Sequence, residues 1–104
     1  MVKILVKKFE KNIKLPVYKT TGSSGMDLVA YNKNKITIHP SKIAIVPTGI
    51  SIAIPKNYEI QIRPRSGLAA KSGISVLNTP GTIDSDYRGE IKIILINISK
   101  KKFV

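Results

Sequence analysis

The chain contains no cysteine and only one histidine, His39. The missing thiols exclude disulfide bonds and thiolate metal sites, and a single imidazole excludes a histidine cluster around a metal or a Cys/His dyad. No stretch approaches ~18 uninterrupted apolar residues, so the sequence predicts no membrane span. Residues 1–8 lack the apolar segment and the cleavage site of a signal peptide. We therefore expect a cytoplasmic protein.

Acidic residues are also scarce, with 6 Asp and Glu against 18 Lys and Arg, which gives a net charge of +12. Such a charge invites a nucleic-acid interpretation. However, the lysines are scattered along the chain, and no aromatic residues interleave with them to form a stacking platform. We expect no dedicated nucleic-acid site, although the positive potential would attract a small polyanion such as a nucleoside triphosphate.

Short runs of Ile and Val separated by Gly, Pro, Asn and Ser predict an all-β fold within a single domain of 104 residues. Alternation of apolar residues is clearest in 50–54, and strands spaced by ~8–12 residues are typical of a sandwich or barrel. The expected strands cover residues 2–8, 26–31, 36–39, 43–46, 50–54, 59–62, 75–77 and 90–98.

Only one short helix is expected, over residues 66–71, with Gly73 ending it. The last strand, 90–98, is among the most apolar segments and lies close to the end of the chain. A sandwich whose chain stops there is expected to leave one sheet edge uncovered.

Three of the scarce acids, Asp84, Asp86 and Glu90, crowd into residues 81–90. Apolar, β-branched runs lie on both sides, so the segment is interpreted as a hairpin. A carboxylate at the tip of a hairpin beside Tyr87 can activate a water molecule next to a bound ligand. The same residues also suit a solvated acidic turn.

A second candidate site is the junction between an expected strand and the expected helix, at Arg65-Ser66-Gly67. A hydroxyl group, a backbone N–H that can be approached closely and a guanidinium group together suit a phosphate. The alternative is a serine that caps the helix beside solvated arginines.

Two further segments carry polar side chains at strand ends. Asp27 follows a Gly/Ser-rich turn and enters an expected strand, where Arg65 or a hydrated metal ion could be its partner; an Asx turn is the alternative. Asn78 ends another strand before a Pro-Gly break. Free backbone groups and the Asn78 amide could read the edge of a pyrimidine, and Tyr87 could close the pocket against a sugar or form an aromatic cross-strand pair.

Three segments, 24–28, 65–69 and 78–90, resemble in order and spacing the first three motifs of the trimeric dUTP diphosphatases, or dUTPases. The resemblance extends over nearly the whole chain. It implies a jelly-roll-like β-barrel or sandwich with one very short helix, and a homotrimer with active sites at the subunit interfaces. It also implies hydrolysis of dUTP to dUMP and pyrophosphate, which keeps uracil out of DNA, with Mg²⁺ bound through the substrate's phosphates.

The resemblance also implies a role for each matched residue. Asp84 would be the base that activates water, and Tyr87 would lie under the deoxyribose and reject a 2′-hydroxyl group. Uracil would be read by the side chain and backbone of the pocket segment: Asn78, Gly81, Thr82 and Ile83. The phosphates would be held by the helix junction, with one carboxylate in support: Arg65, Ser66, Gly67 and Asp27.

The family's fourth and fifth motifs, an Arg-x-Ala-Gln strand and a glycine-rich arm, do not occur in these 104 residues. We therefore expect this stretch of chain to bind and hydrolyse dUTP poorly, and a weakly active or inactive nucleotide-binding remnant is the first alternative. A dCTP deaminase of the same fold group is the second. Arg65-Ser66-Gly67 and the run from Asp84 to Tyr87 argue against the deaminase, which usually has Arg-Ser-Ser at the helix junction.

Overall fold

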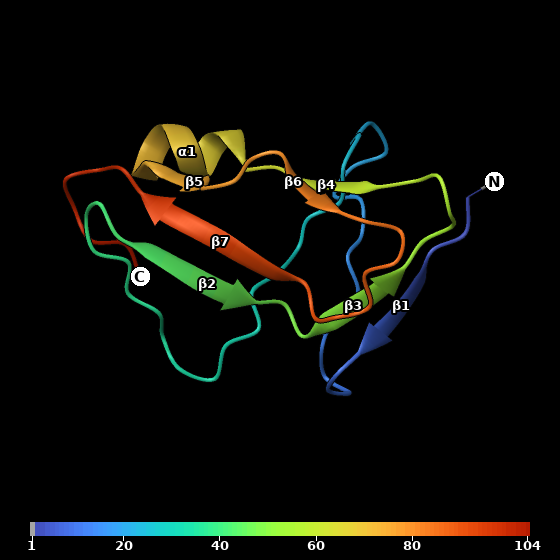
Figure 1. The fold of residues 1–104 in the computed structure, drawn as a ribbon. Helices are drawn as coiled ribbons and strands as arrows, with labels where there is room; N and C mark the ends of the chain where they lie inside the picture. The colour runs from blue at the N-terminus through green and yellow to red at the C-terminus, as the bar shows by residue number, and fades with distance from the viewer. Residues whose placement is uncertain (1) are drawn as a thin grey trace.

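A computed structural model describes residues 2–104, which form seven short strands and one helix (Figure 1). The expected mostly β fold is confirmed, because the Ile- and Val-rich runs pair as strands. The strands are β1 Leu5–Lys8, β2 Ile43–Pro47, β3 Ile50–Ala53, β4 Ile60–Ile62, β5 Ile74–Val76, β6 Gly81–Ile83 and β7 Lys92–Asn97. The helix is α1, Ser66–Ser72.

The strands form three small antiparallel sheets, with the orders β1-β3, β2-β7-β5 and β4-β6. In the three-stranded sheet, β2 and β5 lie on either side of β7 (Figure 1). Side chains alternate between the two faces of a strand. Val46 of β2 and Val76 of β5 are buried on the inner face, whereas Ile43 and Ile45 of β2 are exposed on the outer face.

The core is built mainly from isoleucine. Ile13, Ile50 and Ile91 form one buried cluster, against which partly buried side chains such as Val6 and Ile83 pack. This cluster joins the start of the chain to β3 and to the segment that precedes β7, so Ile91 anchors the end of the loop between β6 and β7 in the core.

Helix α1 confirms the expected short helix. Arg65 is the N-cap residue in an extended conformation, without a side-chain capping bond. Gly73 ends the helix with φ 65°, in the left-handed region that glycine adopts at little cost. The addition of a Cβ atom there would also bring it within 2.9 Å of the Ser99 side chain.

Several sequence-based expectations are wrong. Residues 26–31 form no strand, and residues 36–39 contribute only an isolated bridge between Ile38 and Phe103. The strand near the C-terminus is not itself an edge strand: β7 is the central strand of its sheet, and the edges of that sheet are β2 and β5. Residues 81–90 do not form a simple hairpin, because the strands on either side of the loop do not pair with each other. Strand β6 pairs with β4, and β7 pairs with β5.

The single histidine, His39, is exposed. Among residues 2–104, no helix has the length and apolar character needed to cross a membrane.

Candidate functional site

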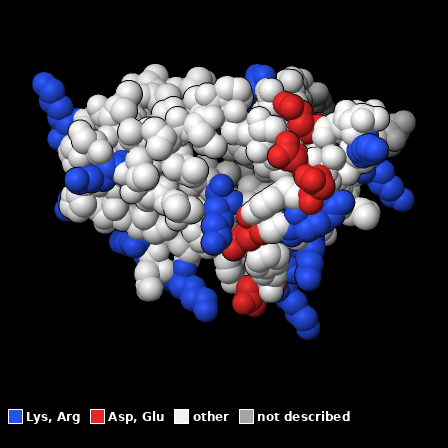
Figure 2. All heavy atoms as spheres, viewed as in Figure 1, with Lys and Arg blue, Asp and Glu red and all other residues white. Residues whose placement is uncertain are grey.

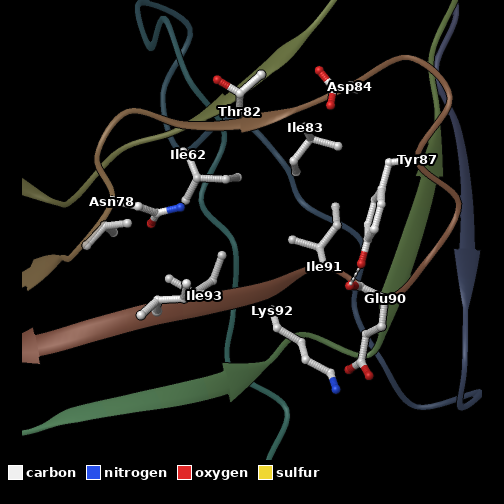
Figure 3. A pocket seen from close by; sticks show the side chains of 13 residues that line it. Ile62, Asn78, Thr82, Ile83, Asp84, Tyr87, Glu90, Ile91, Lys92 and Ile93 are labelled. Carbon is white, nitrogen blue, oxygen red and sulfur yellow. Dashed lines mark hydrogen bonds between the residues drawn. The ribbon is translucent and has the colours of Figure 1, made fainter.

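A cavity of about 180 Å³ lies between β6 and β7. Its apolar floor comes from three strands and the segment before β7, and Figure 3 shows these isoleucine side chains pointing into the space between the strands. The floor residues are Ile62, Ile83, Ile91 and Ile93. Asn78 lies at one end of this floor and Tyr87 at the other (Figure 3).

The end of the cavity at Asn78 depends on a glycine. A Cβ atom at Gly81 would lie 3.1 Å from Nδ2 and 3.4 Å from Oδ1 of Asn78, so the amide group lies against the bare backbone of Gly81. The peptide bond between Thr79 and Pro80, in the turn between them, is cis. Because side chains alternate along β6, Ile83 points into the cavity and Thr82 points out of it (Figure 3). Thr82 can therefore contribute only its backbone to the cavity.

The other end of the cavity is formed by the loop after β6. Asp84 is exposed at the end of the strand, and the Tyr87 N–H donates to its carbonyl oxygen at 3.1 Å, which closes a turn. Tyr87 is 45% exposed, and its ring hangs from the loop beside the cavity (Figure 3). Its hydroxyl group donates to the carbonyl oxygen of Glu90 at 2.8 Å. Both residues line the cavity, but Figure 3 shows the Asp84 carboxylate on the same side of β6 as Thr82, whereas the Tyr87 ring lies on the side of Ile83.

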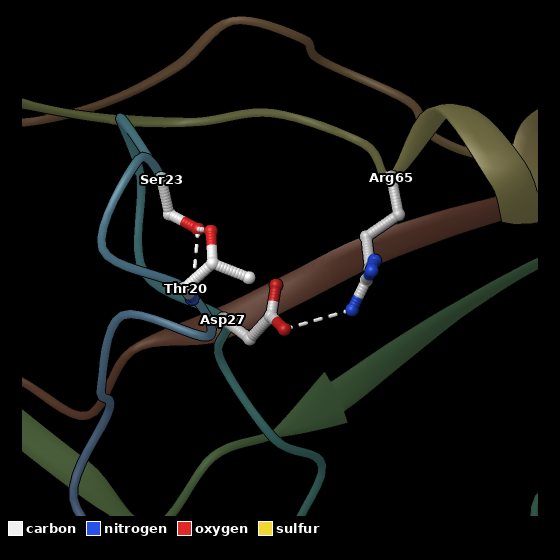
Figure 4. A network of polar contacts seen from close by, with 4 residues as sticks. All are labelled: Thr20, Ser23, Asp27 and Arg65. Carbon is white, nitrogen blue, oxygen red and sulfur yellow. Dashed lines mark hydrogen bonds and ion pairs between the residues drawn. The ribbon is translucent and has the colours of Figure 1, made fainter.

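The second candidate site contains an ion pair. Nη1 of Arg65 lies 2.8 Å from Oδ2 of Asp27, and the two side chains are 59% and 38% exposed (Figure 4). Arg65 was one of the two partners expected for Asp27. Since both side chains are solvated, the pair contributes little to stability, typically ~0–1 kcal/mol. Ser66 and Gly67 are exposed, and nothing lies within 4 Å of a Cβ built on Gly67.

The fold therefore divides the predicted site residues into two groups. The first group lines one cavity: Asn78, Gly81, Thr82, Ile83, Asp84 and Tyr87. The second group gathers at the start of α1 and does not line that cavity: Asp27, Arg65, Ser66 and Gly67. Within residues 2–104, one copy of the chain does not bring the two groups together around one pocket.

Sequence reasoning missed part of the cavity lining, because strand periodicity does not reveal which strands meet. Ile62 of β4 and Ile93 of β7 line the same cavity from positions far apart in the chain. Glu90, which also lines it, could have been found from the scarcity of acids alone.

The charge distribution suits a phosphorylated ligand that brings its own cation. Figure 2 shows Lys and Arg side chains around the edges of the molecule and also beside the hollow in the middle of this face, where the Asp and Glu side chains gather. Within residues 2–104, no group of three or more His, Asp or Glu side chains could hold a metal ion. Mg²⁺ commonly keeps several water molecules and binds through one or two carboxylates together with substrate phosphates, so it does not need a cluster of three protein ligands.

Comparison with known proteins assigns the family. The family model described as dUTPase matches residues 11–104 of the chain. The chain belongs to the dUTPase family. A curated dUTPase, the deoxyuridine 5′-triphosphate nucleotidohydrolase of Rickettsia prowazekii, is 55% identical over 105 residues, which cover 100% of this chain and 71% of that protein. The protein of the same name from Rickettsia bellii is 58% identical over 105 residues, covering 100% of this chain and 70% of the relative.

Solved dUTPase structures have the same fold. The dUTPase of phage phi11 of S. aureus superposes with a TM-score of 0.81 at 23% identity, over 93% of this chain and 61% of the phage protein. A mutant dUTPase of Staphylococcus bacteriophage 80alpha, solved with dUpNHpp, gives 0.81 at 24% identity, over 92% of this chain and 59% of that protein. The chain thus spans about six tenths of the length of these phage dUTPases.

Proposed function

We propose that the protein hydrolyses dUTP to dUMP and pyrophosphate. The observation that carries the proposal is the cavity between β6 and β7, which has an apolar floor and is lined by Asn78, Asp84 and Tyr87. A carboxylate, a hydrogen-bonding amide and an aromatic ring are the groups needed to activate water, read a pyrimidine and pack against a sugar. The relatives from Rickettsia carry the name of this activity.

Asp84 is the proposed catalytic base. Its carboxylate takes a proton from a water molecule whose oxygen forms a new bond to phosphorus. The phosphorus attacked is that of the α-phosphate, and its bond to the oxygen bridging the α- and β-phosphates breaks, so that pyrophosphate leaves with the electron pair of that bond. Asp84 is exposed at the mouth of the cavity, where a water molecule can reach it from solvent.

Nucleotide selection is assigned to the two ends of the cavity. The Asn78 amide and the backbone of Gly81, Thr82 and Ile83 offer both donors and acceptors to the edge of uracil, as a complementary strand would. The Tyr87 ring packs against the deoxyribose, where a 2′-hydroxyl group would collide with it. The apolar floor excludes water from below the base, which strengthens these hydrogen bonds.

The triphosphate is assigned to Arg65, Ser66 and Gly67, with Asp27 holding the guanidinium group in place. Arg65 can contact phosphate oxygens with the nitrogens that Asp27 does not engage. Mg²⁺, bound through the phosphates and supported by a carboxylate, supplies charge neutralisation of the triphosphate.

A homotrimer would complete this site. A cavity of about 180 Å³ is smaller than the ~300–1,000 Å³ of typical small-molecule sites, and the residues proposed to bind the triphosphate lie outside it.

The outer face of the three-stranded sheet carries uncovered isoleucines: Ile43 and Ile45 are 54% and 61% exposed. Their cross-strand partners Ile96 and Ile94 extend the same apolar face. Such a face marks an interaction surface, so we place the phosphate residues of one copy beside the cavity of another.

Mixing two inactive variants tests the shared site. Asp84→Asn removes the base and Arg65→Ala removes a phosphate ligand, so each variant alone should hydrolyse dUTP slowly. If each site combines two copies, unfolding and refolding the variants together at equal amounts should restore about a quarter of the sites, since copies associate at random. Pyrophosphate release measures the recovery. A mixture that is no more active than its components would show that both residues serve a site within one copy.

The proposed reaction itself is tested by its substrate range. With Mg²⁺ present, we expect pyrophosphate release from dUTP and at least ~100-fold slower release from UTP, dCTP and dTTP. Cytosine would leave the hydrogen-bonding groups of the site unpaired, the 2′-hydroxyl group of UTP would collide with Tyr87, and thymine adds a methyl group to a small cavity. Ammonia released from dCTP would instead identify a deaminase. Binding of dUTP without any pyrophosphate release would identify a nucleotide-binding remnant.

A further inference from the structure

Glu90 is one of the three acids clustered in residues 81–90, and it has no part in the catalysis or nucleotide binding proposed for the cavity. Asp84 and Asp86 are exposed, whereas Glu90 is half-buried. Its Oε2 atom accepts a hydrogen bond of 3.0 Å from the backbone N–H of Gly49. Glu90 therefore ties the loop after β6 to the turn between β2 and β3, which is distant in the chain.

That turn can hold the loop firmly. Gly49 is buried with φ 71°, and a Cβ atom there would collide with Cδ1 of Ile13, so only glycine fits. The neighbouring Thr48 is 3% exposed, and its hydroxyl group donates to the carbonyl oxygen of Ile91 at 2.6 Å. The N–H of Ile91 in turn donates to the carbonyl oxygen of Ile50 at 2.9 Å. The turn thus holds Glu90 and Ile91 by hydrogen bonds that involve both side chains and backbone.

Glu90 in turn supports Tyr87. Its carbonyl oxygen accepts the hydrogen bond from the Tyr87 hydroxyl group at 2.8 Å (Figure 3). The phenol also lies tightly against Gly89, where a Cβ atom would come within 2.6 Å of the hydroxyl oxygen and 2.8 Å of Cζ. The direction of the Tyr87 ring is therefore fixed by the backbone of Gly89 and Glu90, and the Glu90 carboxylate anchors that backbone.

We propose that Glu90 is a positioning residue for sugar selection: through its bond to Gly49 it holds the Tyr87 ring where the ring excludes a 2′-hydroxyl group. Glu90 acts through Tyr87 and needs no contact with the nucleotide. The proposal rests on the proposed function, in which Tyr87 packs against the deoxyribose. It predicts that loss of the carboxylate acceptor relaxes the choice of sugar more than it slows turnover of dUTP.

Two substitutions of similar length separate the acceptor from the bulk of the side chain. Glu90→Gln keeps a side-chain oxygen that can accept from Gly49, and Glu90→Met does not. We expect Glu90→Met to lower the ratio of kcat/KM for dUTP to that for UTP by about tenfold or more, because small displacements of a positioning group are costly. Glu90→Gln should restore most of that ratio. Asp86→Asn, which removes a charge from the same loop, should leave the ratio unchanged.

Hydrogen exchange reports on the bond between Gly49 and Glu90 directly, without a measurement of activity. In the unchanged chain, the Gly49 amide proton should exchange slowly with solvent by NMR; exchange should quicken in Glu90→Met and stay slow in Glu90→Gln. If Glu90→Met does not fold, Tyr87→Phe takes its place: it should lower the sugar ratio while the Gly49 amide stays protected. Faster Gly49 exchange with an unchanged sugar ratio would overturn the proposal, as would slow exchange in a folded Glu90→Met.

The two proposals can fail separately. If the unchanged chain does not hydrolyse dUTP, the proposed function is wrong. The sugar ratio is then the dissociation constant of UMP divided by that of dUMP. Under those conditions, equal ratios in the unchanged chain and Glu90→Met would overturn the role of Glu90, and a lower ratio in Glu90→Met would support it.

Discussion

Replacement of Asp84 by asparagine is expected to lower the turnover of dUTP by ~10²–10⁴-fold, the range that a positioned general base supplies. Asparagine has nearly the same size and keeps one oxygen, but its amide cannot accept the proton of the attacking water. The nucleotide should still bind, because uracil and sugar are held by other residues of the cavity. Pyrophosphate release gives turnover, and calorimetric titration with the analogue dUpNHpp gives binding.

The neighbouring acid serves as the matched control for Asp84. Asp86→Asn removes the same charge from the same loop, but Asp86 does not line the cavity. Turnover of Asp86→Asn should stay within about threefold of the unchanged chain, as expected for a surface change away from the site. Equal losses in the two variants would indicate an effect of charge on the triphosphate rather than proton transfer by Asp84. Full activity in Asp84→Asn would remove Asp84 from the mechanism.

The strand positions could be predicted from the sequence largely because Ile and Val runs are interrupted by strong turn residues. Residues 43–46 and 50–54 were expected as strands, and β2 and β3 lie there. The helix also followed from local signals, since Gly73 takes the left-handed conformation that ends α1. Such features depend on neighbours in the chain, which the sequence displays directly.

Strand partners could not be predicted, because pairing depends on contacts between distant residues. The segment 81–90 was interpreted as a hairpin, yet its first residues, Gly81–Ile83, pair with Ile60–Ile62. Conversely, residues 26–31 were expected as a strand and pair with none. Their backbone is tied at one point, where the Tyr31 N–H donates to the carbonyl oxygen of Pro47 at 2.8 Å.

The candidate site was predictable where one segment carries it. Asn78, Asp84 and Tyr87 lie within one stretch of chain, and the turn after β5 and the loop after β6 bring them to one cavity. Glu90 was missed as a functional residue because its partner, Gly49, lies in another turn. Nothing in the sequence near either residue indicates that the two meet.

The same limit applies to Asn97, which the sequence presents as one polar residue at the end of an apolar strand. It is completely buried, and its amide nitrogen donates to the carbonyl oxygens of Ile38 and Lys101, each at 2.8 Å. Its Oδ1 atom accepts from the Ser99 N–H at 2.9 Å and from the Ser99 hydroxyl group at 2.7 Å. One side chain thus ties the end of β7 to the segment around Ile38 and to the turn that follows.

Asn97→Leu is therefore expected to lower the free energy of unfolding by about 2–4 kcal/mol, because it leaves buried carbonyl and N–H groups without partners. That loss is a large share of the ~5–15 kcal/mol that stabilises a typical domain. Urea denaturation at a fixed protein concentration measures it, since association of copies would add to apparent stability. Ser99→Ala keeps both bonds donated by the Asn97 amide, and it should cost only about 1 kcal/mol. Equal midpoints for Asn97→Leu and the unchanged chain would show that this network adds nothing to stability.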